Sequence, residues 1–238
     1  MKNKLVTIIQ LIFTLFMYLL AIVYFGLAST PGIYLFVAVY NKALNFSLIS
    51  RCFLGGLSLA AAYFVFGLTL ILLAGGTRCI LRLKLKEGTH NIFSKDAMVW
   101  SFVSSLYLMI NFTFIDFILL TPFANLLLKM LGAKIGKNVQ INSKYVYDAT
   151  LLEIGDNSVI GGGAIIIGHV VERGRLKLKR VIIGNNVTIG SHATVMPGCQ
   201  IGDNAIIGAG AILLKNTVVE PRSIWYGVPA KSIRDRKK

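Results

Sequence analysis

The sequence is poor in acidic residues and in side chains that bind metals. Only ten of its 238 residues are Asp or Glu, against 25 Lys and Arg, and residues 1–76 contain no acidic residue. The three cysteines, Cys52, Cys79 and Cys199, have the spacing of neither a metal site nor a disulfide framework. No nucleic-acid-binding motif is present. We therefore expect the net charge of +15 to face an anionic membrane rather than nucleic acid, and we expect no metal site.

Long apolar runs dominate the first third of the chain. Hydrophobic residues make up 55% of the sequence and the mean hydropathy is +0.69, which is too apolar for one soluble domain. Leu5 to Ala28 carries no charge, and a membrane-spanning helix needs about 20 such residues. A cleaved signal peptide is the alternative, but its apolar region is typically only about 7–15 residues long. Cys52 to Ala74 is a second predicted span, ended by Gly75-Gly76.

The segment between these two runs leaves the number of spans open. Thr30-Pro31-Gly32 predicts a helix break. Ile33 to Ile49 could then be a further span, a re-entrant piece or an interfacial helix. Two full spans with both ends in the cytoplasm is the simplest topology, within a range of two to four. By the positive-inside rule, the basic residues that fix this orientation are Lys2, Lys4, Arg78, Arg82, Lys84 and Lys86.

Residues 87–134 lie between the apolar runs and the rest of the chain. Glu87 to Asp96 is a polar connection, and Ala97 to Leu131 is apolar again, with interruptions at Trp100, Asp116, Pro122 and Lys129. This pattern predicts helices that lie in the membrane interface, or a shallow hairpin. A soluble helical cap on the following domain is the alternative.

A six-residue repeat organises the C-terminal part. Seven aliphatic residues fall six apart, and a small or slim residue follows each of them four positions later. Such a fixed period indicates a repeat architecture, and neither helical nor alternating periodicity explains it. A β-sandwich with chance spacing is disfavoured by seven repeats in register. The aliphatic positions are Ile183, Ile189, Val195, Ile201, Ile207, Leu213 and Val219; the small ones are Val187, Ala193, Cys199, Ala205, Ala211, Thr217 and Ser223.

Each hexad is expected to form a short strand and a tight turn, so that three hexads make one triangular coil of eighteen residues. Coils then stack at about 4.8 Å, the spacing of paired strands, and each is stabilised by its neighbours. The period starts at Ile135-Gly136, slips by one residue between Tyr147 and Ile154, and is interrupted by an inserted loop. We therefore predict transmembrane helices with a basic cytoplasmic linker in residues 1–96, interfacial helices in 97–134, and a prism in 135–238 with the inserted loop at 168–180.

The last part of the prism resembles the hexapeptide acyltransferases, in particular the galactoside and maltose acetyltransferases. The matching stretches are Ile183 to Ser191, Ile207 to Ala211 with Lys215, and Tyr226 to Lys231. The resemblance implies a left-handed parallel β-helix and a homotrimer that binds acetyl-CoA in the groove between two prisms. It also implies that Gly190, Ser191, Gly208 and Ala209 hold the pantetheine arm and thioester, and that Lys215, Lys231 and Arg234 meet the phosphates.

A second resemblance extends further along the chain. His169-x-x-Glu172 with Arg175 and Lys177, and the stretch Leu131 to Gly136, resemble the membrane C-terminal domains of ε-poly-lysine synthetases and the related terminal domains of nonribosomal peptide synthetases. Those domains pair membrane helices with hexapeptide prisms. This chain would be one such unit without adenylation and carrier domains. The resemblance leaves open an amide-forming acyltransferase that takes its acyl group from a carrier protein.

Acyl transfer needs a general base, and histidine suits this role because its pKa lies near neutrality. His169 opens the inserted loop, where the resembling enzymes place their base. Glu172 is the candidate to orient the imidazole, with Asp148 and Glu153 as alternatives and an ion pair with Arg173 or Arg175 as a purely structural role. His90 is expected to be a solvated linker residue, and His192 to lie on the outer surface of a hexad.

Together these features predict a multi-pass membrane protein with a cytoplasmic catalytic domain. Its expected activity is transfer of an acetyl or other short acyl group from acetyl-CoA to a hydroxyl or amine. The expected partners are membrane lipid and an acceptor that is a small molecule, a glycan or a lipid-linked sugar. A non-catalytic scaffold or a metal-binding prism is disfavoured, because a prism zinc site needs three histidines and only His169 and His192 lie within it.

Overall fold

The computed structural model describes residues 2–233, with side chains from residue 7 onward. The chain divides into two compact units, Met1–Gly76 and Thr77–Lys238. Each unit is described by itself below.

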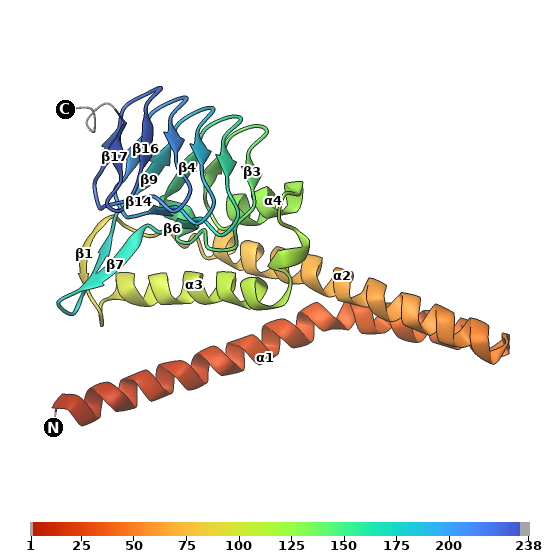
Figure 1. The fold of residues 1–238 in the computed structure, drawn as a ribbon. Coiled ribbons are helices and arrows are strands. Elements are labelled where there is room, and N and C mark those ends of the chain that lie inside the picture. Colours follow the sequence, from red (N-terminus) through yellow and green to blue (C-terminus); the bar gives the residue numbers. More distant parts are fainter. Residues whose placement is uncertain (1, 234–238) are drawn as a thin grey trace. The chain divides into compact units, whose positions relative to one another are not determined.

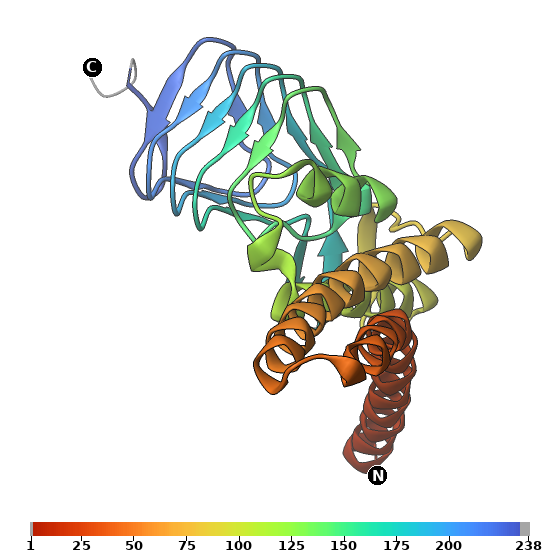
Figure 2. The same cartoon turned by 90° about the vertical axis from the view of Figure 1, so that its right-hand side faces the viewer.

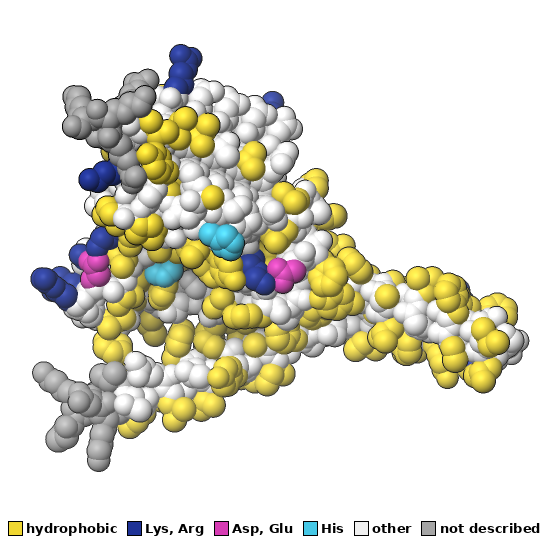
Figure 3. Space-filling view, in the orientation of Figure 1, with side chains coloured by type: hydrophobic (Ala, Val, Ile, Leu, Met, Phe, Trp, Pro, Cys, Tyr) yellow, Lys and Arg dark blue, Asp and Glu magenta, His cyan; other side chains and the backbone are white. Residues whose placement is uncertain are grey.

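The first unit is made of two long apolar helices. Helix α1 (Lys2–Lys42) leads through the short helix η1 (Ala43–Asn45) to α2 (Leu48–Ile80) (Figure 1). Two segments, Thr7–Asn45 and Leu48–Ile80, have hydropathies of 2.4 and 2.3 and are long enough to cross a membrane. Hydrophobic side chains are distributed along both helices (Figure 3), and Leu19 and Ile49 are 61% and 83% exposed. An apolar surface of this kind fits a lipid environment better than water.

The predicted helix break at Thr30-Pro31-Gly32 is wrong, because α1 continues through Pro31 to Lys42. Proline removes one backbone donor, but apolar surroundings favour a helix because every other backbone group is then paired internally. The Thr30 hydroxyl donates to the Gly26 carbonyl oxygen at 2.9 Å. A Cβ atom at Gly32 would lie 2.7 Å from the Ala62 carbonyl oxygen, so the missing side chain lets α1 and α2 approach closely. Residues 33–42 thus extend the first helix rather than start another.

The second unit contains the predicted hexapeptide β-helix. Figure 2 shows its coils stacked along one axis, with parallel strands on each face of the prism. Thr188, Thr194 and Gln200 pair with Ile206, Ile212 and Val218, each eighteen residues further on. The aliphatic residues of the hexads are buried, as are the small residues from Val187 to Ala211. The predicted inward orientation is confirmed.

Three sheets form the faces of the prism. The first contains β3 (Gln140–Ile141), β5 (Val159–Ile160), β10 (Thr188–Ile189), β13 (Ile206–Ile207), β16 (Ile224–Tyr226) and the antiparallel β17 (Lys231–Ser232). The second contains β6 (Ile165–Ile166), β11 (Thr194–Val195) and β14 (Ile212–Leu213). The third contains β2 (Lys134–Ile135), β4 (Leu152–Ile154), β9 (Val181–Ile183), β12 (Gln200–Ile201) and β15 (Val218–Val219).

Two departures from the period of eighteen lie where the sequence places them. Lys134 pairs with Glu153, nineteen residues on, which is the one-residue slip, and the short helix η3 (Ala149–Leu151) forms there. Glu153 pairs with Ile182, twenty-nine residues on, because the inserted segment lies between them. This segment is a β-hairpin of β7 (His169–Glu172) and β8 (Arg175–Leu178). Its turn residues Arg173 and Gly174 have φ angles of 48° and 70°, and positive φ at both positions fits the turn that matches strand twist.

The segment before the prism folds onto it. The predicted polar connection contributes β1 (Gly88–Asn91), which pairs with β8 and completes a three-stranded sheet. Ser94 caps α3 (Lys95–Thr113), which is followed by η2 (Ile115–Phe117) and α4 (Pro122–Met130). Ala97 of α3 packs in one buried cluster with Leu151 of the prism and Leu176 of the hairpin. This packing fits the helical cap; contact of residues 97–134 with a membrane remains a prediction.

Close stacking of the coils explains the glycines and the turn residues of the hexads. A Cβ atom at Gly161 would lie 2.7 Å from both the Ile189 oxygen and the Ser191 nitrogen of the next coil. The fourth residue of a hexad has positive φ, which Asn and Gly adopt most readily. Asn186, Asn204 and Gly210 occupy this place, with φ angles of 54°, 60° and 66°.

We expect Gly161→Ala to destabilise the prism, because its methyl group must displace the backbone of the neighbouring coil. Overpacking of this kind costs about 1–3 kcal/mol. The measurement is thermal unfolding of the detergent-solubilised chain. Gly162→Ala is the matched control, since a Cβ atom there would lie no closer than 3.4 Å to any neighbour. Equal melting temperatures for the two variants would contradict this account of the glycine positions.

Candidate active site

A histidine and a buried aspartate meet at the corner where the hairpin leaves the prism. His169 is the first residue of β7, and Asp148 directly precedes η3. The imidazole Nδ1 lies 2.6 Å from Asp148 Oδ2. The Asp148 side chain is only 1% exposed, whereas that of His169 is 28% exposed. The pair therefore joins a sheltered carboxylate to an imidazole that solvent or a ligand can reach.

Asp148 is held by donors from two parts of the chain, α3 and the start of the hairpin. Its Oδ1 accepts the Trp100 indole N–H at 2.8 Å, and its Oδ2 accepts the Gly168 backbone N–H at 2.8 Å. Burying a carboxylate is unfavourable unless such bonds replace its hydration. Trp100, on α3, also places its ring 4.8 Å from the His169 ring, centroid to centroid. Helix, prism and hairpin thus fix the carboxylate and the imidazole together.

This arrangement suits His169 to act as a base at its other nitrogen. When Nδ1 carries the proton and donates it to Asp148, the lone pair of Nε2 is free to accept one. No residue that the structure describes forms a hydrogen bond with Nε2. A hydroxyl or amine placed there could lose its proton to the imidazole as it attacks an acyl group.

Glu172 does not orient His169. Its carboxylate accepts hydrogen bonds from Lys177, at 2.9 Å, and from Lys215. These two lysines, Lys215 above all, lower the pKa of Glu172 to about 2, so it stays ionised throughout the neutral range. Asp148, one of the two alternatives, takes the position beside the imidazole. The other, Glu153, pairs with Lys134 at 2.9 Å and with Arg180.

The glycines predicted to border the pantetheine arm have a structural reason to be small. A Cβ atom at Gly190 would lie 2.5 Å from the Ala209 nitrogen, and one at Gly208 would lie 3.1 Å from Tyr226 Cβ. Their own chain fills this space, so their small size by itself does not indicate a cofactor. Ser191 and Ala209 are exposed on the outside of the coils and remain available to a ligand.

The lysines predicted to meet phosphates differ in their surroundings. Lys215 lies in a pocket with Lys177 and Lys179, and ammonium groups of this kind fit phosphate oxygens. Lys231 is exposed on β17, at the C-terminal end of the prism. Arg234 lies outside the residues that the structure describes.

The other two histidines, His90 and His192, lie in a set of local polar contacts and at an exposed turn, respectively. His90 Nε2 lies 2.9 Å from the Lys86 carbonyl oxygen and its Nδ1 lies 3.3 Å from Asp96. His192 is exposed at the fourth place of its hexad, with a φ angle of 57°, where most other hexads have Asn or Gly. Within residues 2–233, no group of three His, Cys, Asp or Glu side chains is placed to hold a metal ion.

Trp100 is the residue of this site that the sequence does not reveal. It lies 48 residues before Asp148, on a separate helix, and the sequence pattern marks it only as an interruption of an apolar run. Asp148 has a weak signal, because it lies within the one-residue slip of the hexads.

Comparison with known proteins identifies the repeat. Residues 180–223 match the family described as bacterial transferase hexapeptide (six repeats). A delta-poly-L-ornithine synthetase from Acinetobacter baumannii (strain AB307-0294) is 33% identical over 109 residues. That alignment covers 46% of this chain but only 8% of the relative, so the chain spans less than a tenth of that protein's length.

Part of the chain is similar to two solved acetyltransferases. A galactoside acetyltransferase in complex with coenzyme A is 31% identical, with a TM-score of 0.38 over 48% of this chain and 71% of that one. A maltose O-acetyltransferase from Clostridium difficile 630 is 27% identical, with a TM-score of 0.38 over 44% of this chain and 59% of that one. Residues 180–223, the regular coils that follow the hairpin, belong to the bacterial transferase hexapeptide family.

Proposed function

We propose that the chain is a membrane-anchored acyltransferase that moves an acetyl or other short acyl group from acetyl-CoA to a hydroxyl or amine. The observation that carries the proposal is the contact between the imidazole of His169 and the buried Asp148, with Nε2 left open. The transferase hexapeptide repeat beside this pair supports the reaction class. The lysines around Lys215 suit the phosphates of a CoA thioester.

The residues of the dyad perform proton transfer in this mechanism. His169 Nε2 takes the proton of the acceptor as its oxygen or nitrogen bonds to the acyl carbon. Asp148 holds the imidazole in the required tautomer and stabilises its charged form. As the carbon–sulfur bond breaks, the same imidazolium returns the proton to the leaving thiolate. The bound thioester supplies the acyl carbon, and Trp100 keeps the carboxylate and imidazole aligned.

The apolar helices α1 and α2 are proposed to cross the membrane as a hairpin, with the basic segment after α2 in the cytoplasm. Two continuous helices favour two crossings. An anchored enzyme meets acceptors that are themselves held by the membrane, such as lipid-linked glycans. As a homotrimer, the chain would bind the donor in grooves between prisms, near Ser191 and Ala209, with Lys231 and Arg234 toward its phosphates.

A second candidate function is amide formation from an acyl group held by a carrier protein. The similarity to a delta-poly-L-ornithine synthetase favours it, and the same dyad could deprotonate an amine. The donor separates the two candidates. Label from acetyl-CoA that enters a membrane extract supports the first; transfer from a loaded carrier alone supports the second.

We expect His169→Gln to reduce transfer of labelled acetyl groups by a factor of about 10²–10⁴, the usual contribution of a general base. His192→Gln is the matched control and should retain activity, since that side chain lies at an exposed turn. Both variants should melt at the same temperature as the native chain. Full activity in His169→Gln would refute its assignment as the base.

Asp148→Asn should lower kcat by a factor of about 10–10³, because an amide can accept from Nδ1 only weakly and does not stabilise an imidazolium. Steady-state kinetics with acetyl-CoA as varied substrate provide the measurement. Glu172→Gln separates the two acidic residues, since the structure places it away from His169 and predicts a far smaller loss of kcat. An equal loss of kcat in both variants would contradict the role given to Asp148.

Trp100→Phe tests a positioning residue. Phenylalanine keeps an aromatic ring beside His169 but removes the indole N–H that Asp148 accepts. We expect kcat to fall about three- to tenfold with KM for acetyl-CoA unchanged. This loss is smaller than the full contribution of a hydrogen bond to a charged group, about 1.5–3 kcal/mol, because the Gly168 N–H still donates to Asp148. A change in KM alone, or none in either constant, would show that Trp100 serves packing only.

A further inference from the structure

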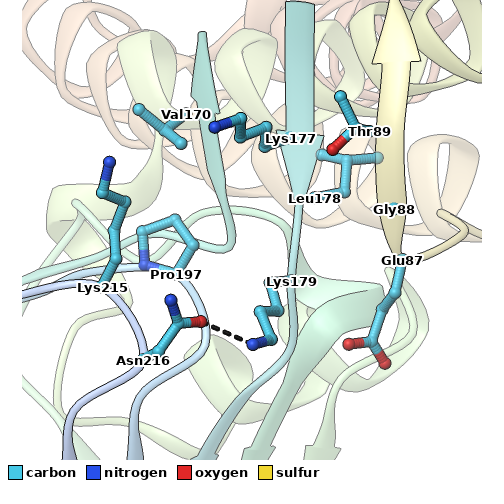
Figure 4. Close-up of a pocket in the computed structure, with 10 residues that line it drawn as sticks. All are labelled: Glu87, Gly88, Thr89, Val170, Lys177, Leu178, Lys179, Pro197, Lys215 and Asn216. Atoms are coloured by element: carbon cyan, nitrogen blue, oxygen red, sulfur yellow. Dashed lines mark hydrogen bonds between the residues drawn. The ribbon is translucent and has the colours of Figure 1, made fainter. Parts of the chain in front are cut away.

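The pocket that contains Lys215 is a cavity between the hairpin and the prism. Its volume is about 510 Å³, and it is lined by residues of β1, β7, β8 and two turns of the prism. Figure 4 shows Lys177, Lys179 and Lys215 around it. Lys177 lies on β8, Lys179 directly follows that strand, and Lys215 lies in a turn of the prism. Val170 and Lys177 are paired across the hairpin, as are His169 and Leu178. Because alternate residues of a strand face opposite sides, Val170 and Lys177 lie on the face away from the His169 ring.

The cavity is positively charged. Its lysines outnumber its acidic lining residue, Glu87, whose carboxylate is engaged by Arg180 at 3.2 Å. Lys179 donates to Asn216 Oδ1 at 2.5 Å, so a neutral side chain rather than an acid holds this ammonium group. An anionic ligand entering here would meet cations whose charges are only partly balanced.

Glu172 marks the point where two of these cations converge. Its carboxylate bridges Lys177 and Lys215, one on the hairpin and one on the prism. One carboxylate supplies a single negative charge to two ammonium groups. A phosphate group carries up to two charges and three acceptor oxygens, so it satisfies the same donors better. The bridge is thus an internal anion at a position that suits a phosphate.

We propose that this cavity binds a phosphate-bearing ligand through Lys177, Lys179 and Lys215, and that Glu172 is the internal competitor that the ligand displaces. The inference deepens the proposed function, on which its choice of ligand rests. The phosphate could belong to the nucleotide part of coenzyme A or to a phosphate-bearing acceptor. In either case, binding would release the bridge between hairpin and prism.

The test is calorimetric titration of the full chain in detergent with inorganic pyrophosphate. We expect Lys177→Ala/Lys215→Ala to weaken binding at least tenfold, and Glu172→Gln to tighten it about three- to tenfold because the competing charge is removed. Lys137→Ala, at an exposed lysine on the first coil, is the control and should bind like the native chain. The proposal would be overturned if the affinity for pyrophosphate were the same in the native chain and in the double variant. It would also be overturned if Glu172→Gln left that affinity unchanged.

Competition then identifies the source of the phosphate. Displacement of pyrophosphate by coenzyme A but not by a short-chain lipid phosphate assigns the cavity to the donor, and the reverse assigns it to the acceptor. Failure of both to compete would overturn the proposal. His169→Gln should still bind pyrophosphate, because its ring lies on the other face of β7. Loss of transfer and loss of phosphate binding are therefore separable results.

Discussion

The structure of the second unit depends on the pairing of each coil with the next at a spacing of eighteen residues. Backbone hydrogen bonds such as that from Thr188 N to Ala205 O, at 3.0 Å, hold successive coils at strand distance. This pairing leaves no room for a side chain at hexad glycines such as Gly161 and Gly190. It also permits extra residues only where the chain can leave and rejoin the same sheets. The slip before Glu153 and the hairpin before Ile182 are the two such places.

Both departures lie at one corner, which is why they form a site. The backbone N–H of Tyr147 donates to the Ile166 oxygen at 2.9 Å, so the slip and the start of the hairpin lie on adjacent coils. Asp148 and His169 follow these two residues closely. The regular coil that follows pairs with the strands beside both segments, and α3 closes the corner with Trp100. A rigid scaffold therefore positions residues from its irregular parts, as is common for functional sites.

How far the sequence predicts this molecule depends on the range of the interactions concerned. The β-helix is predictable because its period is local and is repeated in every hexad. His169 is predictable because it opens the break in that period. The choice of Glu172 fails because residues 169 and 172 are three apart in what proves to be a strand, so their side chains face opposite sides. Trp100 depends on tertiary packing that no local pattern encodes.

The prediction of a helix break at Pro31 is wrong for a different reason. Proline ends helices in water, where the freed backbone groups find other partners. In an apolar environment a continued helix leaves fewer groups unpaired than a break does. Gly32 then becomes a packing residue, since its lack of a side chain admits Ala62 of α2. Pro-Gly is therefore a weaker indicator of a turn when it lies within an apolar run such as the one that precedes Thr30.

The hairpin carries residues of both the candidate active site and the cationic cavity. Leu176 and Leu178 on its inner face are buried with Leu85 and Ala97, and His169 lies on this side beside Trp100. Glu172 and Lys177 lie on its outer face, next to the cationic cavity. Alternation along two short strands thus separates the His169 imidazole from a cluster of cations by the thickness of one sheet. Because β8, which carries Lys177, pairs with β7, a ligand that shifts the outer face would act on the strand that carries the imidazole.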